Sequence, residues 1–212
     1  TAMHIVEGAG ADGITVHLRQ DRRHIQDADL PMLRQEITTR LNLEMANTGE
    51  MVGIALRVKP DMVTLVPESP DEVTTQGGLD VVRHERDVAA TIARFRAAGI
   101  HPSIFIDAQR EQIAASKRAG AASIELCTAQ YAEATSPAVQ DREFDAIRST
   151  ARYAQELGLL VNVGHALDYT NTARIASIPG LYDFNIGHAI IIQAVFVGLE
   201  RAVKDMVKLV KG

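Results

Sequence analysis

The sequence has no tryptophan, a single cysteine and few aromatic residues. One cysteine, Cys127, excludes an internal disulfide and is compatible with a reducing compartment. No apolar run reaches the roughly 18 residues that a membrane-spanning helix needs, and no signal peptide is recognisable. We therefore expect a cytoplasmic protein without a membrane segment.

Basic charge is also scarce. The chain has 22 Lys and Arg against 27 Asp and Glu, a net charge of −5, whereas a nucleic-acid-binding protein usually carries a basic excess. We therefore expect no nucleic acid as a partner. The lysines are few and none follows a predicted strand, which argues against an enzyme-bound Schiff base. They are Lys59, Lys117, Lys204, Lys208 and Lys211.

Aliphatic residues are abundant, and they recur as short apolar runs alternating with amphipathic stretches. The predicted strands are 13–18, 41–45, 61–66, 102–107, 122–127, 159–163 and 182–187. The predicted helices are 29–39, 48–58, 80–98, 109–119, 138–157, 170–177 and 189 to about 210. With 212 residues and no recognisable linker, we expect one domain over 1–212.

Alternating strands and helices predict βαβ units and a parallel sheet. The chain opens on what reads as the end of a helix, so we expect residues upstream of Thr1 to supply one more strand. Eight βα units would form an α/β (β/α)8 TIM barrel. The alternative is an open doubly wound sheet, for which the usual GxGxxG phosphate loop is absent.

Polar side chains lie at the ends of the predicted strands, which in a barrel form the catalytic face. His17, Arg19 and His24 form a cationic cluster suited to a phosphate or carboxylate, or else a solvated loop that pairs with nearby aspartates. Glu44 lies in a buried strand, where desolvation would raise its pKa toward that of a general base. The alternative for Glu44 is an internal ion pair with an arginine.

A five-residue motif that contains Gly-His occurs twice, as NVGHA at 162–166 and NIGHA at 185–189. Because glycine allows close backbone approach to an anion, Gly187 and His188 predict a phosphate cradle, and His165 an imidazole over the reacting atoms. The alternative is two tight turns with incidental histidines. Cys127 has no paired base and is predicted to be a buried structural thiol. A metal site is an alternative if His17, His24, Glu44 and His165 converge, but no HxH or HExxH spacing supports it.

Six segments together resemble the pyridoxine 5′-phosphate synthase family. They are GADGITVHLRQDRRHIQDADL, LNLEMA, LVPESPDEVTTQGGLD, IFIDA, NVGHALDYTN and FNIGHAII, and the likeness runs over essentially the whole chain, in the same order and spacing. The resemblance implies a (β/α)8 barrel, a cytoplasmic homo-octamer and no metal or organic cofactor. It implies condensation of 3-amino-2-oxopropyl phosphate with 1-deoxy-D-xylulose 5-phosphate to pyridoxine 5′-phosphate, phosphate and water.

The resemblance also implies roles for particular residues. His17 and Glu44 match proton acceptors, His165 a proton donor, and Glu125 a carboxylate that stabilises a transition state. The substrate-binding positions are Arg19, His24, Thr74, Ala166, Gly187 and His188. Two phosphate esters need two anion sites, and the two candidates are Arg19 with His24, and Gly187 with His188.

The chain departs from the family pattern at several positions. Ala166, Cys127 and Ala129 stand where the family usually has Gly, His and Gly. The Asn-x-Asp-His segment that the family's first strand carries is absent. Two other hypotheses are a different phosphosugar barrel enzyme, such as an epimerase or isomerase, and a barrel that serves only as a binding or assembly module.

Overall fold

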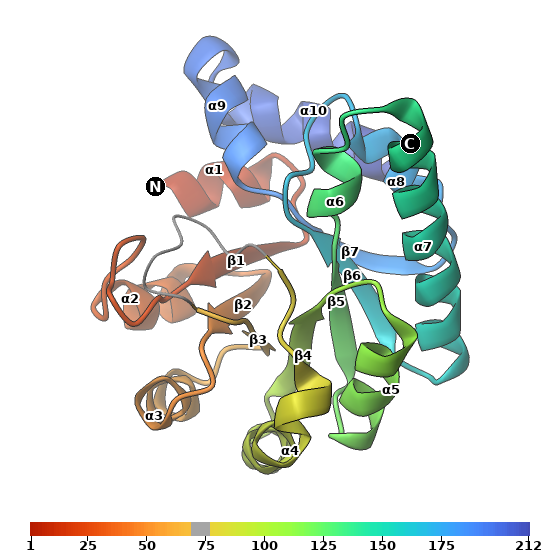
Figure 1. Ribbon diagram of the computed structural model, residues 1–212. Coiled ribbons are helices and arrows are strands. Elements are labelled where there is room, and N and C mark those ends of the chain that lie inside the picture. The colour runs from red at the N-terminus through yellow and green to blue at the C-terminus, as the bar shows by residue number, and fades with distance from the viewer. Residues whose placement is uncertain (69–76) are drawn as a thin grey trace.

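The computed structural model describes residues 1–68 and 77–212, and its sheet has seven parallel strands in chain order (Figure 1). Each strand pairs in parallel with the next. The strands are β1 (Gly13–His17), β2 (Arg40–Met45), β3 (Met62–Leu65), β4 (His101–Ile106), β5 (Ser123–Cys127), β6 (Leu160–Gly164) and β7 (Leu181–Asn185). Every predicted strand is confirmed to within two residues at either end.

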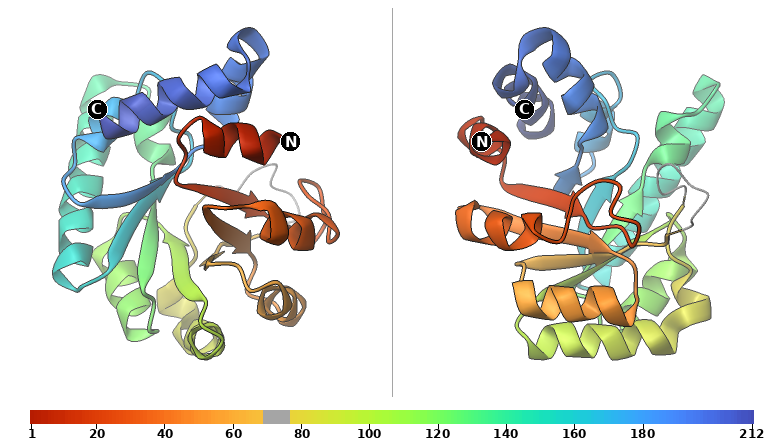
Figure 2. Two further views of the ribbon diagram at one scale, coloured as in Figure 1. Left: turned by 180° about the vertical axis from the view of Figure 1, so that it is seen from behind. Right: turned by 90° about the vertical axis from the view of Figure 1, so that its left-hand side faces the viewer.

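Helices connect successive strands and lie around the outside of the curled sheet (Figures 1 and 2). They are α1 (Ala2–Gly8), α2 (Asp29–Glu36), α3 (Gly49–Val58), α4 (Val81–Ala97), α5 (Arg110–Arg118), α6 (Ala129–Ala132), α7 (Pro137–Glu156), α8 (Thr172–Ala176), α9 (His188–Val197) and α10 (Leu199–Lys211). This is a TIM-barrel-like α/β fold. The doubly wound alternative is wrong, because that fold reverses its strand order and covers both faces of the sheet.

Local sequence explains where the helices begin. Thr48 accepts a hydrogen bond from the Met51 amide at 3.3 Å, so its side chain caps the start of α3. Ser136 accepts one from the Val139 amide at 3.4 Å, directly before the proline that opens α7. These caps satisfy amides that have no partner inside the helix and fix where the chain leaves each loop.

The predicted helix from 189 to about 210 is wrong in one respect, because it is two helices. Gly198 has φ 82° and ψ 153°, which breaks the chain between α9 and α10. That conformation is readily adopted only by glycine. The short helix α6 was not predicted, because its few residues cannot show helical periodicity.

The hydrophobic core lies between the sheet and the surrounding helices. All residues of β3 and β5 are buried, as expected for strands covered on both faces. The inner face of the sheet also carries buried polar side chains, including Asn42, Thr64 and Asn162. The interior of the barrel is therefore partly polar.

The edges of the sheet, β1 and β7, approach each other through side chains. Thr15 Oγ1 donates a hydrogen bond to Asn185 Oδ1 at 2.9 Å. Arg40 on β2 donates to both oxygens of Asp183 on β7, at 2.7 and 2.9 Å. The sheet is therefore curled enough for its first and last strands to line one interior. An eighth strand upstream of Thr1 stays a prediction.

No helix among the described residues is long and apolar enough to cross a lipid bilayer.

Candidate active site

His17 lies between two carboxylates at the carboxyl end of the sheet. The parallel register pairs it with Glu44 on β2, and its Nδ1 lies 3.9 Å from Glu44 Oε2. On its other side, Nε2 lies 3.0 Å from Oε1 of Glu68, which follows β3. Only 13% of the His17 side chain, 14% of that of Glu44 and 4% of that of Glu68 is exposed. All three groups are therefore largely withdrawn from water.

Burial shifts the protonation of His17 and Glu44 toward neutral forms. It raises the pKa of Glu44 to about 7. It also lowers the pKa of His17, although the hydrogen bond and charge of Glu68 oppose this effect. Near neutral pH, His17 is a free base, and Glu44 exchanges readily between acid and carboxylate. Among the described residues, Glu44 forms no ion pair with an arginine.

The loop after β1 brings a buried cation to the same place. Arg19 is 1% exposed, with its Nε 3.5 Å from Asp21 Oδ1. The His24 ring centroid lies 5.8 Å from that of His17. Burial and then the charge of Arg19 lower the pKa of His24. The solvated-loop alternative does not describe Arg19, which is buried beside the two histidines.

A second group of residues lies at the ends of β5 and β6. Glu125 is fully buried, and its Oε1 lies 3.9 Å from His165 Nδ1. Burial, followed by the charge of Glu44, raises the pKa of Glu125 well above its ordinary value. A Cβ added at Gly164 would lie 2.2 Å from Glu125 Oε1, so that oxygen occupies space that only glycine leaves open.

The turn after Gly164 is strained. His165 and Ala166 both have left-handed backbones, with φ 77° and 59°. Thr128 Oγ1 lies 2.7 Å from the carbonyl oxygen of Gly164 and 2.5 Å from that of His165, so its single hydroxyl proton is shared between them and holds the turn. The His165 ring stacks on Phe105 with centroids 4.1 Å apart. Burial lowers the pKa of His165 to about 4, with a further contribution from His17.

A chain of interior hydrogen bonds ends on Glu125. Thr64 Oγ1 donates to Asn42 Oδ1 at 3.0 Å, and Asn42 Nδ2 donates to Thr15 Oγ1 at 3.4 Å. Thr15 Oγ1 in turn donates to Asn185 Oδ1, and Asn185 Nδ2 donates to Glu125 Oε2 at 2.6 Å. Because Oε2 accepts a hydrogen bond, the proton of an un-ionised Glu125 belongs on Oε1, the oxygen nearer His165.

The remaining predicted residues are less closely connected. Gly187 and His188 follow β7 at the same end of the sheet, and His188 is the exposed first residue of α9. Among the described residues, no hydrogen bond or ion pair joins His188 to the groups above. The predicted substrate contact Thr74 lies outside the described residues.

Sequence reasoning assigned no role to four residues that contact the predicted set: Glu68, Phe105, Thr128 and Asn185. Glu68 and Asn185 could have been proposed, because both are polar residues at the carboxyl end of a predicted strand. Thr128 gave the same signal, because it directly follows the predicted strand 122–127. Phe105 gave none, because its role depends on which side chain packs against it.

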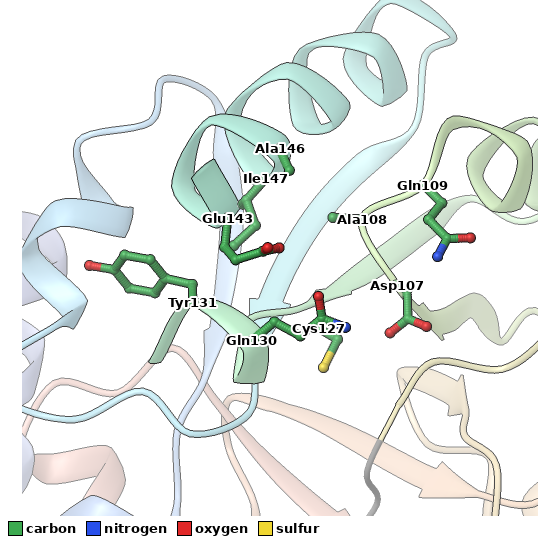
Figure 3. A pocket seen from close by; sticks show the side chains of 9 residues that line it. All are labelled: Asp107, Ala108, Gln109, Cys127, Gln130, Tyr131, Glu143, Ala146 and Ile147. Carbon is green, nitrogen blue, oxygen red and sulfur yellow. The ribbon is translucent and has the colours of Figure 1, made fainter. Parts of the chain in front are cut away.

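A small cavity lies beside this region, between β4, β5 and α7 (Figure 3). Asp107, Cys127 and Glu143 are among the residues that line it, and its volume is about 50 Å³. That space suits a few water molecules rather than a phosphate ester. Burial raises the pKa of Cys127 to about 12, in agreement with the prediction of a structural thiol.

The arrangement can move protons in an environment largely closed to water. It combines a neutral imidazole, a carboxyl group with a pKa of about 7, a second buried acid and a buried guanidinium. Such groups suit general acid–base chemistry on an anionic compound.

Two enzymes of known structure share this fold at low sequence identity. A 3-keto-L-gulonate-6-phosphate decarboxylase from Vibrio cholerae aligns with a TM-score of 0.70 at 14% identity, over 97% of this chain and 87% of the other. An N-(5′-phosphoribosyl)anthranilate isomerase from Pyrococcus furiosus gives 0.68 at 14% identity, over 99% and 92%. These likenesses support the fold alone.

Sequence similarity is more specific. A pyridoxine 5′-phosphate synthase of Geobacter sulfurreducens is 54% identical over 210 residues, 99% of this chain and 88% of the relative. That of a Synechococcus species is 54% identical over 202 residues, 95% and 84%. The family model for the pyridoxal phosphate biosynthesis protein PdxJ matches residues 1–212. With this match spanning every strand that carries the site, the chain belongs to the PdxJ family.

Proposed function

We propose that the chain is a pyridoxine 5′-phosphate synthase that condenses 3-amino-2-oxopropyl phosphate with 1-deoxy-D-xylulose 5-phosphate. The products are pyridoxine 5′-phosphate, inorganic phosphate and water. Membership of the PdxJ family and the names of relatives about 50% identical support this reaction. The observation that carries the proposal is the position of His17 beside Glu44, together with the pair formed by the buried Glu125 and the half-buried His165.

The chemistry suits a site without a catalytic lysine. The amine of one substrate condenses with the ketone of the other, so the imine forms between the two substrates with release of water. The remaining work is proton transfer during elimination, ring closure and aromatisation. The five lysines lie on α5 and α10 or directly after α3, away from the carboxyl ends of the strands.

The proposed roles follow the surroundings of each residue. His17 and Glu44 accept protons, and burial keeps Glu125 un-ionised so that it can donate a hydrogen bond to a developing anion. His165, with a pKa of about 4, is neutral before reaction. It therefore takes up a proton from one intermediate and donates it to a later one.

The proposed substrate contacts form two groups. Arg19 and His24 lie beside His17 and suit one phosphate ester. Gly187 and His188, at the start of α9, suit the second, with Thr74 and Ala166 as further contacts. For assembly, we propose the homo-octamer that the family resemblance implies, and the exposed apolar residues of α9 support association between chains.

The test is the formation of pyridoxine 5′-phosphate from the two substrates, followed by chromatography with fluorescence detection. We expect turnover by the unmodified chain and a fall of at least 100-fold in kcat for Glu44→Gln and for His165→Asn. Glu200→Gln, in an exposed pair with Lys204, is the matched control. Product formation unaffected by either site substitution would overturn the assignment.

Separate titrations test the two anion sites. We expect Arg19→Ala and His188→Ala each to weaken binding of a different phosphate ester by about 10-fold or more. Equal weakening of the same ester by both variants would contradict two sites. It would favour an enzyme that acts on one phosphorylated substrate.

A further inference from the structure

The two ring nitrogens of His17 have different neighbours. Nε2 lies 3.0 Å from Glu68 Oε1, within hydrogen-bond distance. Nδ1 lies 3.9 Å from Glu44 Oε2, too far for a hydrogen bond but close enough for the two groups to contact one bound molecule. A neutral imidazole carries one proton, so the stronger neighbour determines which nitrogen keeps it.

Glu68 is fixed independently of His17. Its second oxygen, Oε2, accepts hydrogen bonds from the Gln20 backbone amide at 3.0 Å and from Gln20 Nε2 at 3.3 Å. Both contacts are donors, so this carboxylate is oriented as an acceptor on both of its oxygens. Only 4% of its side chain is exposed, which keeps competing water away.

We propose that Glu68 is a positioning residue that keeps the proton of neutral His17 on Nε2 and leaves Nδ1 as the proton-accepting atom on the Glu44 side. The inference rests on the proposed function, because His17 must act as a base for the tautomer to matter in catalysis. It assigns a role to a residue that sequence reasoning had left without one.

The surrounding charges agree with this geometry. His17 faces Glu44 from β2, Glu68 from the segment after β3, Arg19 and His24 from the loop after β1, and His165 from the turn after β6. Burial works to raise the pKa of Glu68, but the donors of Gln20 and His17 more than offset it, so the pKa is lowered. Glu68 is therefore ionised when His17 is neutral.

The proton transfer then has a defined direction. A substrate C–H or O–H bond breaks, its electron pair stays on the substrate, and the proton forms a bond with Nδ1. The positive charge that develops on the ring is stabilised by the Glu68 carboxylate through the unbroken Nε2–H bond. Glu68 gains and loses no proton in this step.

The substitution Glu68→Gln tests the inference. The Gln20 donors will attract the oxygen of the new amide, which leaves its NH₂ group facing Nε2 of His17. We expect the imidazole to change to the Nδ1–H tautomer, which ¹⁵N NMR of histidine-labelled protein detects, with the signal assigned by a His17→Gln variant. We also expect kcat to fall by about 100-fold.

The pH profile distinguishes positioning from a merely structural role. Loss of the Glu68 charge lowers the pKa of His17 further, so the acidic limb of kcat/KM moves to lower pH in Glu68→Gln and stays in place in Glu68→Asp. Glu200→Gln should change neither the limb nor the tautomer. A Glu68→Gln variant with a lower melting temperature but an unmoved limb would overturn the inference.

The unmodified protein alone can also refute it. If ¹⁵N NMR shows Nδ1–H on neutral His17, the inference fails even where Glu68→Gln does not fold. Because this measurement needs no turnover, its outcome is separable from that of the synthase assay.

Discussion

Glu44 is a buried acid whose ionisation opposes folding. Its pKa is about 7 in the folded protein, against an ordinary value of 4.5. The folded state therefore binds more protons than the unfolded state between these values, so the free energy of unfolding falls as pH rises through this range. The side chain was predicted from the sequence as a desolvated base, because a glutamate within a buried apolar strand loses most of its contact with water.

Replacing Glu44 should separate its effect on stability from its effect on catalysis. We expect Glu44→Gln to raise the free energy of unfolding at pH 8 by up to about 3 kcal/mol, since the amide cannot ionise, and to change it little at pH 4.5. Urea unfolding at the two pH values measures this difference. An equal change at both would indicate that packing, rather than charge, determines the effect.

Ala166 should be a site of avoidable strain. A non-glycine residue in the left-handed region costs roughly 1–2 kcal/mol, and part of this is offset by the greater freedom of glycine in the unfolded chain. We expect Ala166→Gly to raise the free energy of unfolding by about 0.5–1 kcal/mol, measured by urea denaturation. Ala93→Gly, at an exposed position inside α4, should lower it by about 1 kcal/mol.

At the scale of elements, the strands were the most predictable part of the molecule. Their apolar, β-branched runs end at glycines and charged turns, so the hydrophobic pattern and the turn-forming residues indicate the same strand boundaries. The break between α9 and α10 was missed because one glycine inside a long apolar helix is often tolerated. Only the local φ of Gly198 reveals it.

The site was predictable as a set of strand ends, but its internal contacts were not. The common end of parallel strands explains why His17, Glu44, Glu125 and His165 could be grouped from the sequence. The hydrogen bond of Glu68 to His17 depends on side-chain orientation and on the register of β1 to β3. These follow from tertiary packing rather than from local sequence.

The two Gly-His turns should tolerate substitution very differently. A Cβ at Gly164 would overlap Glu125 Oε1, whereas a Cβ at Gly187 meets nothing within 4 Å. We expect Gly164→Ala to lower the free energy of unfolding by about 1–3 kcal/mol, as overpacking does, and Gly187→Ala to change it by less than about 0.5 kcal/mol. Thermal and urea melts compare them. Similar losses for both variants would refute the packing argument.

At the scale of the whole molecule, α9 stands out because no residue of it is buried. Ile191, Ile192, Val195, Phe196 and Val197 are exposed, with Phe196 at 80%. Helices that are apolar on every side are normally covered. We therefore expect α9 to contribute to the proposed association between chains.

Charge on α9 should weaken that association. We expect Phe196→Glu to lower the molar mass measured by sedimentation velocity while circular dichroism stays unchanged, because a buried carboxylate at an interface is strongly unfavourable. Val82→Glu, at an exposed position on α4, is the matched control. Assembly that survives Phe196→Glu would remove α9 from the interface.

The hydrogen bonds from Thr64 to Glu125 pass from β1 directly to β7. The first and last strands that the structure describes thus meet at Asn185, whose amide orients the buried acid Glu125. A thermal fluctuation or a distant substitution that weakens these hydrogen bonds between β1 and β7 should shift Glu125. The reactivity of the site should then change before the protein unfolds. In this protein, catalytic activity should therefore depend on how firmly these side-chain hydrogen bonds hold the two edges of the curled sheet together.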